Sequence, residues 1–268
     1  MTQQPPPFGG LLAGKRGVVL GVANDRSIAW GAAQAALSAG AKLAFNYLGP
    51  AQEKRVRALL ADNKDALIVP CDVTKDEEID AFFSAVKGAW DGLDFVIHSV
   101  AYCEKECLHG KFIDTQRAHF AQALDVSAYS LVGVARAAAP LMAQGGSIVC
   151  MSYYGAEKVV PKYNVMGVAK AALEASARYL AEDLGPRGVR VNVVSAGPIK
   201  TLSASAIPGF KTMLDAATRF APLRRNITQE DIARSTLYLL CDLSSGVTGE
   251  TLHVDGGYSI LGMFNETE

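Results

Sequence analysis

The 268-residue sequence lacks the features that mark several whole classes of protein. No apolar run approaches the roughly 20 residues that a membrane-spanning helix needs, so we expect no membrane segment. The formal net charge is only −1, which provides no electrostatic attraction for nucleic acid or for an anionic membrane. We therefore expect the partners to be small molecules or a modest protein surface.

Cysteine is present without the pattern of a disulfide framework or a zinc site. The chain has five cysteines, which is an odd number. The one close pair, Cys103 and Cys107, lacks the second pair or the histidines that zinc would require. We expect reduced thiols, as in a cytosolic protein, and no metal site.

The first residues, MTQQPPPFGG, lack the positively charged start and the apolar stretch of a signal peptide. We interpret residues 1–11 as a mobile lead-in, with the fold beginning near Leu12. Together with the expected reduced thiols, this places the protein in the cytoplasm.

What the sequence does contain is a repeated alternation of short apolar runs and helical patterns. Half of the residues are hydrophobic, which suffices for one large α/β domain or two small ones. No internal linker is visible, which favours one domain over 12–268: a doubly wound parallel sheet of the Rossmann type. The carboxyl ends of its strands would meet at one edge, where ligands bind. We expect strands at 16–21, 42–47, 66–71, 94–99, 147–152, 189–197 and 251–257, and helices at 27–39, 50–62 and 76–90.

The loop after the first expected strand has the residues of a dinucleotide site. Gly21 ends the strand without a Cβ, and Ser27 opens a helix whose first amides could hold a pyrophosphate. The loop is longer than G-x-G-x-x-G, so an ordinary glycine-rich turn is the alternative. The position of the loop favours a dinucleotide site, because Asp72 and Val73 follow the third strand. There a carboxylate could accept a hydrogen bond from the adenine amino group. The segment 98–101 follows the fourth strand, beside the expected nicotinamide ribose.

The end of the second strand bears on the choice of coenzyme. The sequence AFNYLG has no acidic residue for a ribose 2′-hydroxyl, and no Arg or Lys follows at once to meet a 2′-phosphate. Lys54 and Arg55 come further on, in the next helix. The missing basic pair favours NADH over NADPH.

Two Tyr/Lys pairs compete for the catalytic role in the segment 152–170. Tyr154 and Lys158 have the Tyr-x-x-x-Lys spacing, but they follow a strand at once and precede Pro161, so no helix should carry both. Tyr163 and Lys170 follow that proline, in a segment that we expect to be helical to about 183. Seven residues at about 100° each would place both side chains on one helix face, roughly 20° apart.

Such a pair would suit carbonyl or enolate chemistry. A tyrosine hydroxyl can donate a hydrogen bond to a developing oxyanion. The ammonium of Lys170 would lower the pKa of the Tyr163 phenol and reach the ribose hydroxyls of a nicotinamide cofactor.

With these residues in view, the sequence resembles one family closely: the bacterial NADH-dependent enoyl-[acyl-carrier-protein] reductases, within the short-chain dehydrogenase/reductase superfamily. The family pattern Tyr-x9-Tyr-x6-Lys matches Tyr153, Tyr163 and Lys170. The likeness covers nearly the whole chain, through the segments GVANDRSIAWG, CDV, HSVAY, SAGPIKTLSAS and HVDGGYS. The x6 spacing separates this family from its Tyr-x-x-x-Lys relatives.

The resemblance implies the last reductive step of dissociated bacterial fatty-acid synthesis. A hydride would pass from NADH to the β-carbon of a trans-2-enoyl thioester on acyl-carrier protein, and Tyr163 would hold the resulting enolate. Lys170 would hold the cofactor ribose, Tyr153 would line the substrate side, and Cys103 would touch the substrate. The implied cofactor contacts are Gly21, Ser27, Ile28, Leu48, Asp72, Val73, Val100, Lys170, Ile199, Lys200, Thr201, Leu202 and Ser203.

Two residues depart from the family pattern. Leu48 stands where some members place a Gln near the adenosine, which weakens that contact, and Ala101 stands where Gly is common beside the nicotinamide. The resemblance also implies a helical substrate lid at 201–221, for which ordinary surface helices are the alternative. It further implies a homotetramer, in which the apolar segment SILGMF at 259–264 would pack across a subunit boundary.

Two other functions have to be weighed. A ketoreductase or alcohol dehydrogenase of the same superfamily would use Ser152 with a Tyr-x-x-x-Lys pair, but Gly167 stands where the Lys would follow Tyr163. A non-catalytic dinucleotide sensor would keep the fold for binding alone, and the intact Tyr163 and Lys170 argue against it.

Overall fold

A single parallel sheet runs through the protein, whose computed structural model describes residues 8–202, 204 and 207–263. The strand order is β3-β2-β1-β4-β5-β6-β7, and every neighbouring pair is parallel. The predicted Rossmann-type sheet is confirmed, with strand ends within two or three residues of those expected. The strands are β1 (Arg16–Leu20), β2 (Lys42–Tyr47), β3 (Leu67–Pro70), β4 (Phe95–His98), β5 (Gly146–Ser152), β6 (Val189–Ala196) and β7 (Thr251–Val254).

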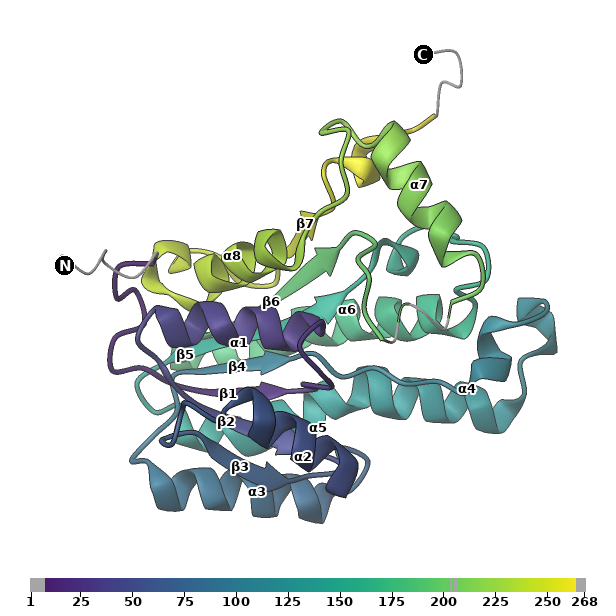
Figure 1. The fold of residues 1–268 in the computed structure, drawn as a ribbon. Helices are drawn as coiled ribbons and strands as arrows, with labels where there is room; N and C mark the ends of the chain where they lie inside the picture. Colours follow the sequence, from purple (N-terminus) through teal and green to yellow (C-terminus); the bar gives the residue numbers. More distant parts are fainter. Residues whose placement is uncertain (1–7, 203, 205–206, 264–268) are drawn as a thin grey trace.

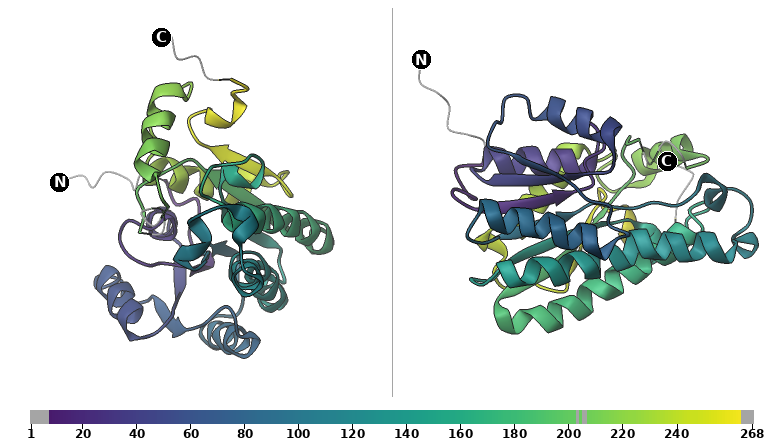
Figure 2. Two further views of the ribbon diagram at one scale, coloured as in Figure 1. Left: turned by 90° about the vertical axis from the view of Figure 1, so that its right-hand side faces the viewer. Right: turned by 90° about the horizontal axis from the view of Figure 1, so that it is seen from below.

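Helices cover both faces of the sheet, which is why its central strands are continuous apolar runs rather than alternating ones (Figures 1 and 2). One face packs against α1 (Ile28–Ser38), α2 (Pro50–Leu59) and α8 (Gln229–Leu240). The other packs against α3 (Asp76–Ala89), α5 (Ser130–Ala138) and α6 (Val165–Leu184). The side chains that fill the two layers include Phe45, Phe95 and Ile97 on the first, and Phe82, Leu131 and Ile148 on the second.

Two helical segments extend beyond these layers at the carboxyl edge of the sheet. Helix α4 (Arg117–Leu124) continues through a π-helical segment, Asp125–Tyr129, directly into α5. Helix α7 (Phe210–Phe220) stands apart from the two helical layers (Figure 1). The family resemblance implies a helical lid at 201–221, and α7 occupies the second half of this segment.

The order of the strands places a crevice at this edge. The chain runs outward from β1 to β2 and β3, then returns to place β4 on the other side of β1. Connections on either side of β1 therefore leave the sheet in opposite directions, which opens a site for ligands at the strand ends.

The predicted lead-in, residues 1–11, lies partly outside the described residues, which begin at Phe8. Phe8 already packs against the first core layer, and Leu12 is fully buried. In the described part of the chain, no helix has both the length and the apolar character needed to cross a membrane.

Candidate active site

The first loop of the site depends on Gly21, which follows β1. Its φ of +96° lies in the left-handed region, which favours glycine. A Cβ at this position would overlap the carbonyl oxygen of Ser99, at the end of β4. The missing side chain therefore allows the two central loops of the crevice to pass close together.

Asn46 fixes the geometry of this loop from inside β2. It is 5 % exposed, its Oδ1 accepts the Gly21 N–H at 3.0 Å, and its Nδ2 donates to the Cys71 carbonyl at 3.1 Å. One amide thus joins the ends of β1, β2 and β3. Our sequence analysis did not select this residue, although a polar side chain inside the apolar run KLAFNY was a signal.

The start of α1 is suited to a phosphate. Ser27 precedes the helix, but its hydroxyl donates to the Asn24 carbonyl at 2.7 Å, and no side chain caps the first turn. The first amides of a helix, beginning here with Ile28, carry a partial positive charge and favour an anion. The missing side chain at Gly21 and the uncapped start of α1 fit the pyrophosphate of a dinucleotide.

The predicted adenosine contacts lie at the ends of β2 and β3. Asp72 Oδ1 already accepts hydrogen bonds from the Thr74 N–H at 3.0 Å and the Thr74 hydroxyl at 2.8 Å. Only part of the carboxylate is therefore available to an adenine amino group. Val73 is buried, whereas Leu48 is 61 % exposed at the end of β2.

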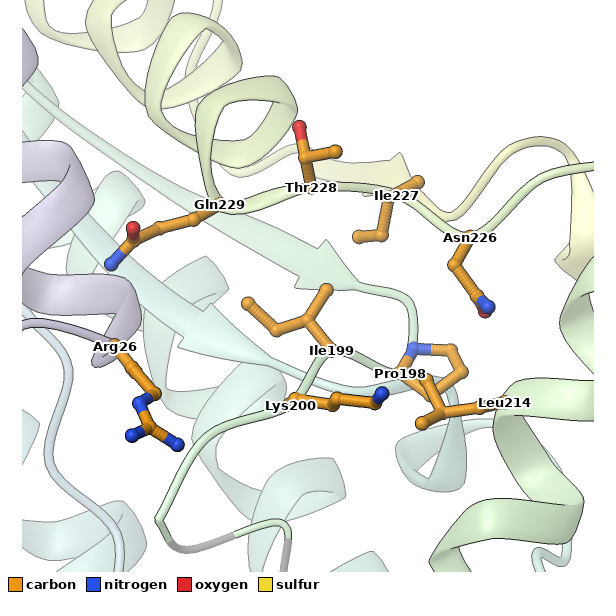
Figure 3. Close-up of a pocket in the computed structure, with 9 residues that line it drawn as sticks. All are labelled: Arg26, Pro198, Ile199, Lys200, Leu214, Asn226, Ile227, Thr228 and Gln229. Atoms are coloured by element: carbon orange, nitrogen blue, oxygen red, sulfur yellow. The ribbon is translucent and has the colours of Figure 1, made fainter.

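A pocket of about 370 Å³ lies between the first loop and the segment that follows β6 (Figure 3). Ile199 and Lys200, two of the predicted cofactor contacts, line it together with Arg26 of the first loop. Thr201 is half-buried and Leu202 is 58 % exposed, while Ser203 lies outside the described residues. Val100 is half-buried after β4, beside the same crevice.

The prediction that Tyr163 and Lys170 lie on one helix is wrong. Helix α6 begins at Val165, and Tyr163 lies in the turn before it. Lys162 and Asn164 on either side have φ values of 68° and 44°, which no α-helix can include. The rotation of about 100° per residue therefore cannot be applied between the two side chains.

The turn nevertheless places Tyr163 in the candidate site. Its ring contacts Tyr153 edge to face, with the ring centroids 4.9 Å apart. A Cβ on Gly155 would overlap the Tyr163 ring, so the turn packs directly on the backbone after β5. The site thus brings together two of the three predicted catalytic side chains by direct contact.

Lys170 lies on α6, and its side chain reaches the end of β5. Its side chain is buried, and its Nζ donates to the Met151 carbonyl at 2.7 Å. Burial lowers its pKa to about 8, and the neighbouring Cys150 and then Glu174 oppose this shift.

The expectation that Lys170 lowers the pKa of Tyr163 is also wrong for this structure. Burial, followed by the neighbouring Tyr153, raises the pKa of the Tyr163 phenol well above its usual value. Tyr163 is therefore a neutral hydroxyl donor at physiological pH, which is the form needed to hold an enolate oxygen.

We predicted that no helix would carry both Tyr154 and Lys158, and the structure confirms this. A short 3₁₀ turn spans Tyr154–Ala156, Lys158 is exposed, and the Tyr154 hydroxyl points to the Ser259 carbonyl at 3.5 Å.

Cys103 lies on the predicted substrate side. It packs, half-buried, against the apolar cluster that contains Tyr163, and Tyr153 and Ile207 pack against the same cluster. Ile207 comes from the segment before α7, so that segment contacts the surroundings of the candidate catalytic tyrosine.

Ser152 and Glu174 form a polar contact that our sequence analysis did not anticipate. The Ser152 hydroxyl donates to Glu174 Oε1 at 2.5 Å, and both side chains are buried. The signal was present: Glu174 follows Lys170 by four residues and falls on the buried face of the same helix.

With this geometry established, comparisons with known proteins identify the family. A family model described as Enoyl-(Acyl carrier protein) reductase matches residues 21–259. An enoyl-[acyl-carrier-protein] reductase [NADH] of Rhizobium meliloti is 54% identical, over 95% of this chain and 93% of the relative.

Solved structures agree with this match. An enoyl-acyl carrier protein reductase of Bacillus cereus, crystallised with NADP+ and an indole naphthyridinone, has a TM-score of 0.93 and 50% identity, covering 94% of this chain and 99% of that one. An enoyl-(acyl-carrier-protein) reductase of Anaplasma phagocytophilum, in complex with NAD, has a TM-score of 0.92 and 50% identity, covering 95% and 97%. This chain belongs to the enoyl-(acyl carrier protein) reductase family.

Proposed function

We propose that this protein is an NADH-dependent enoyl-[acyl-carrier-protein] reductase of bacterial type II fatty-acid elongation. It reduces the trans-2 double bond of an enoyl thioester. The observation that carries the proposal is the contact between Tyr153 and Tyr163 at the end of β5, with buried Lys170 beside it. The family relationship supports the same activity.

The roles of the side chains follow from their environments. Bound NADH supplies the hydride that goes to the β-carbon of the substrate. Tyr163, kept protonated by burial, donates a hydrogen bond to the thioester oxygen as it becomes an enolate. Lys170 binds the ribose of the cofactor, Tyr153 borders the substrate, and Cys103 contacts the acyl chain from the adjoining apolar cluster.

We also propose the following cofactor contacts. Gly21 and the start of α1 at Ser27 and Ile28 hold the pyrophosphate. Leu48, Asp72 and Val73 would hold the adenosine. Val100 would lie near the nicotinamide ribose, and the other proposed contacts are Ile199, Lys200, Thr201, Leu202 and Ser203.

The structure gives a reason to prefer this function over a ketoreductase. A ketoreductase requires a serine hydroxyl aimed at the substrate carbonyl together with a Tyr-x-x-x-Lys pair. Here the Ser152 hydroxyl donates to Glu174 instead, and Gly167 occupies the position of the missing lysine.

The segment 201–221 serves in this proposal as a lid over the acyl pocket. Ile207 packs against the cluster around Tyr163, and α7 presents buried Leu214 and Ala217 towards the body of the protein. Protease cleavage within the segment should slow when NADH is present. Identical digestion with and without NADH would contradict the lid.

We also propose a homotetramer located in the cytoplasm, acting on substrate carried by acyl-carrier protein. Strand β7 forms one edge of the sheet, and Ile260 and Met263 beyond it are 77% and 86% exposed in the described chain. Such apolar side chains are suited to a subunit boundary. Sedimentation that gives a monomer at micromolar concentration would refute the assembly.

The activity is tested by following NADH oxidation with crotonyl thioester and, separately, with acetoacetyl thioester. The proposal predicts oxidation with crotonyl thioester and none with acetoacetyl thioester. The reverse result would assign a ketoreductase.

A further inference from the structure

The catalytic side chains rest on a buried polar contact that the proposed roles do not use. Glu174 is 6% exposed on α6, four residues after Lys170, and the two side chains share the buried face of that helix. Its Oε1 accepts the Ser152 hydroxyl at 2.5 Å. A buried carboxyl is costly for the fold unless it is hydrogen-bonded and close to a positive charge.

Two polar links join α6 to the last residues of β5 at this point. Lys170 Nζ donates to the Met151 carbonyl, and the Ser152 hydroxyl, on the next residue, donates to Glu174. Tyr153 follows directly and packs against Tyr163. The position of all three predicted catalytic side chains therefore depends on how this strand end is held against α6.

The charge of Glu174 acts on the same group. A carboxylate near Lys170 favours the ammonium and so opposes the burial that lowers the pKa of Lys170 to about 8. Burial also raises the pKa of Glu174, and the hydrogen bond from Ser152 opposes that rise and favours the carboxylate. Titratable groups on every element around Glu174 interact with it electrostatically. They are Lys170 and Arg178 on α6, Cys150 on β5, Tyr163 in the turn before α6, Glu157 in the loop after β5, and His253 on β7, which lies 2.7 Å from Glu157.

We propose that Glu174 is a positioning residue of the active site: it holds the end of β5 through Ser152, and its carboxyl lies one helical turn after Lys170 on the same buried face of α6, where it favours the Lys170 ammonium. This inference rests on the proposed function only for the identity of the cofactor and substrate. Because the Glu174 carboxyl is buried and hydrogen-bonded to Ser152, we expect it to act through its neighbours Ser152, Lys170 and Tyr163.

Two variants separate the two contributions. Glu174→Gln keeps an oxygen that can accept the Ser152 hydroxyl but removes the charge. Ser152→Ala removes the hydrogen bond but keeps the charge. Glu182→Gln, at an exposed position on the same helix, is the matched control for loss of a carboxylate.

The measurement is the Kd for NADH as a function of pH, from the quenching of protein fluorescence, together with kcat and KM. For Glu174→Gln we expect the rise in Kd at alkaline pH to begin about one pH unit lower than in the wild type, since it removes one nearby charge. For Ser152→Ala we expect a kcat about tenfold lower, because the strand end is misplaced. We expect its pH dependence to shift less than that of Glu174→Gln, since the carboxyl remains although the hydrogen bond that lowers its pKa is lost. Glu182→Gln should match the wild type in both.

The proposal is overturned if Glu174→Gln binds NADH with the wild-type pH dependence, or if Ser152→Ala shifts it equally. If Glu174→Gln does not fold, Glu174→Met provides a second neutral side chain of similar size and should shift the dependence in the same direction. Thermal unfolding of the cofactor-free variants reports on folding separately. A wild-type protein that binds NADH but reduces no enoyl thioester would refute the proposed function, and the binding data would still decide the role of Glu174.

Discussion

Replacing Tyr163 with phenylalanine should abolish most of the turnover while leaving the protein folded. The variant loses only the phenol oxygen and retains the buried ring. The edge-to-face contact with Tyr153, at 4.9 Å between centroids, is available to a phenyl ring as well. The loss of stability should therefore stay below about 1 kcal/mol.

The catalytic cost is larger because the hydroxyl acts on charge that develops in the transition state. Removing one preorganised donor to an oxyanion typically lowers kcat by about 10²- to 10³-fold, or roughly 3–4 kcal/mol. The KM for NADH should change little, since the proposed ribose contact belongs to Lys170. The assay is steady-state oxidation of NADH with crotonyl thioester.

Tyr154→Phe is the matched control, because it removes a hydroxyl from the neighbouring tyrosine that has the competing Tyr-x-x-x-Lys spacing. It should keep near wild-type turnover. Wild-type kcat in Tyr163→Phe would refute the reasoning and favour a protein that uses the fold only to bind a dinucleotide.

Three further predictions concern the cofactor site. Gly21→Val should raise the KM for NADH at least about tenfold in steady-state assays, since its side chain would overlap the Ser99 carbonyl and force the crevice loops apart; unchanged KM and melting temperature would contradict this. Asn46→Ala should destabilise the protein by about 1–3 kcal/mol in chemical denaturation, because it leaves the Gly21 N–H and the Cys71 carbonyl without their buried partner; a loss within error would show that the contact is dispensable. The KM for NADH should rise as pH increases through about 8, because the lowered pKa of Lys170 means that its ammonium is lost at lower pH than usual. A KM that stays constant up to about pH 10, which is near the usual lysine pKa, would exclude this.

The sheet could be predicted from the sequence because its strands are short apolar runs rich in β-branched residues, such as RGVVL and LIVP. The longer helical patterns between these runs indicate parallel strands joined by helices. The π-helical link at Asp125–Tyr129 could not be found in this way, because a π segment differs from an α-helix in its hydrogen bonding and not in its composition.

In the candidate site, too, some features could be predicted from the sequence and others could not. The choice of Tyr163 and Lys170 over Tyr154 and Lys158 depended on Pro161, a residue with a fixed backbone preference. The geometric reason that we gave for the pair failed, because the positive φ of Asn164 is set by packing, including its side-chain hydrogen bond to the Cys107 carbonyl at 3.1 Å. Burial of the tyrosine, and hence the raised pKa of its phenol, likewise depends on tertiary contacts.

The central claim is that the side chains at the end of β5 reduce an enoyl double bond with NADH. The most direct test is NADH oxidation by the purified protein with trans-2-enoyl thioesters on acyl-carrier protein, with product analysis by mass spectrometry. We expect the saturated acyl thioester, which is two mass units heavier than the substrate because one hydride and one proton have been added. A protein that instead reduces 3-ketoacyl thioesters to hydroxyacyl products, or that binds NADH and oxidises none, would contradict it.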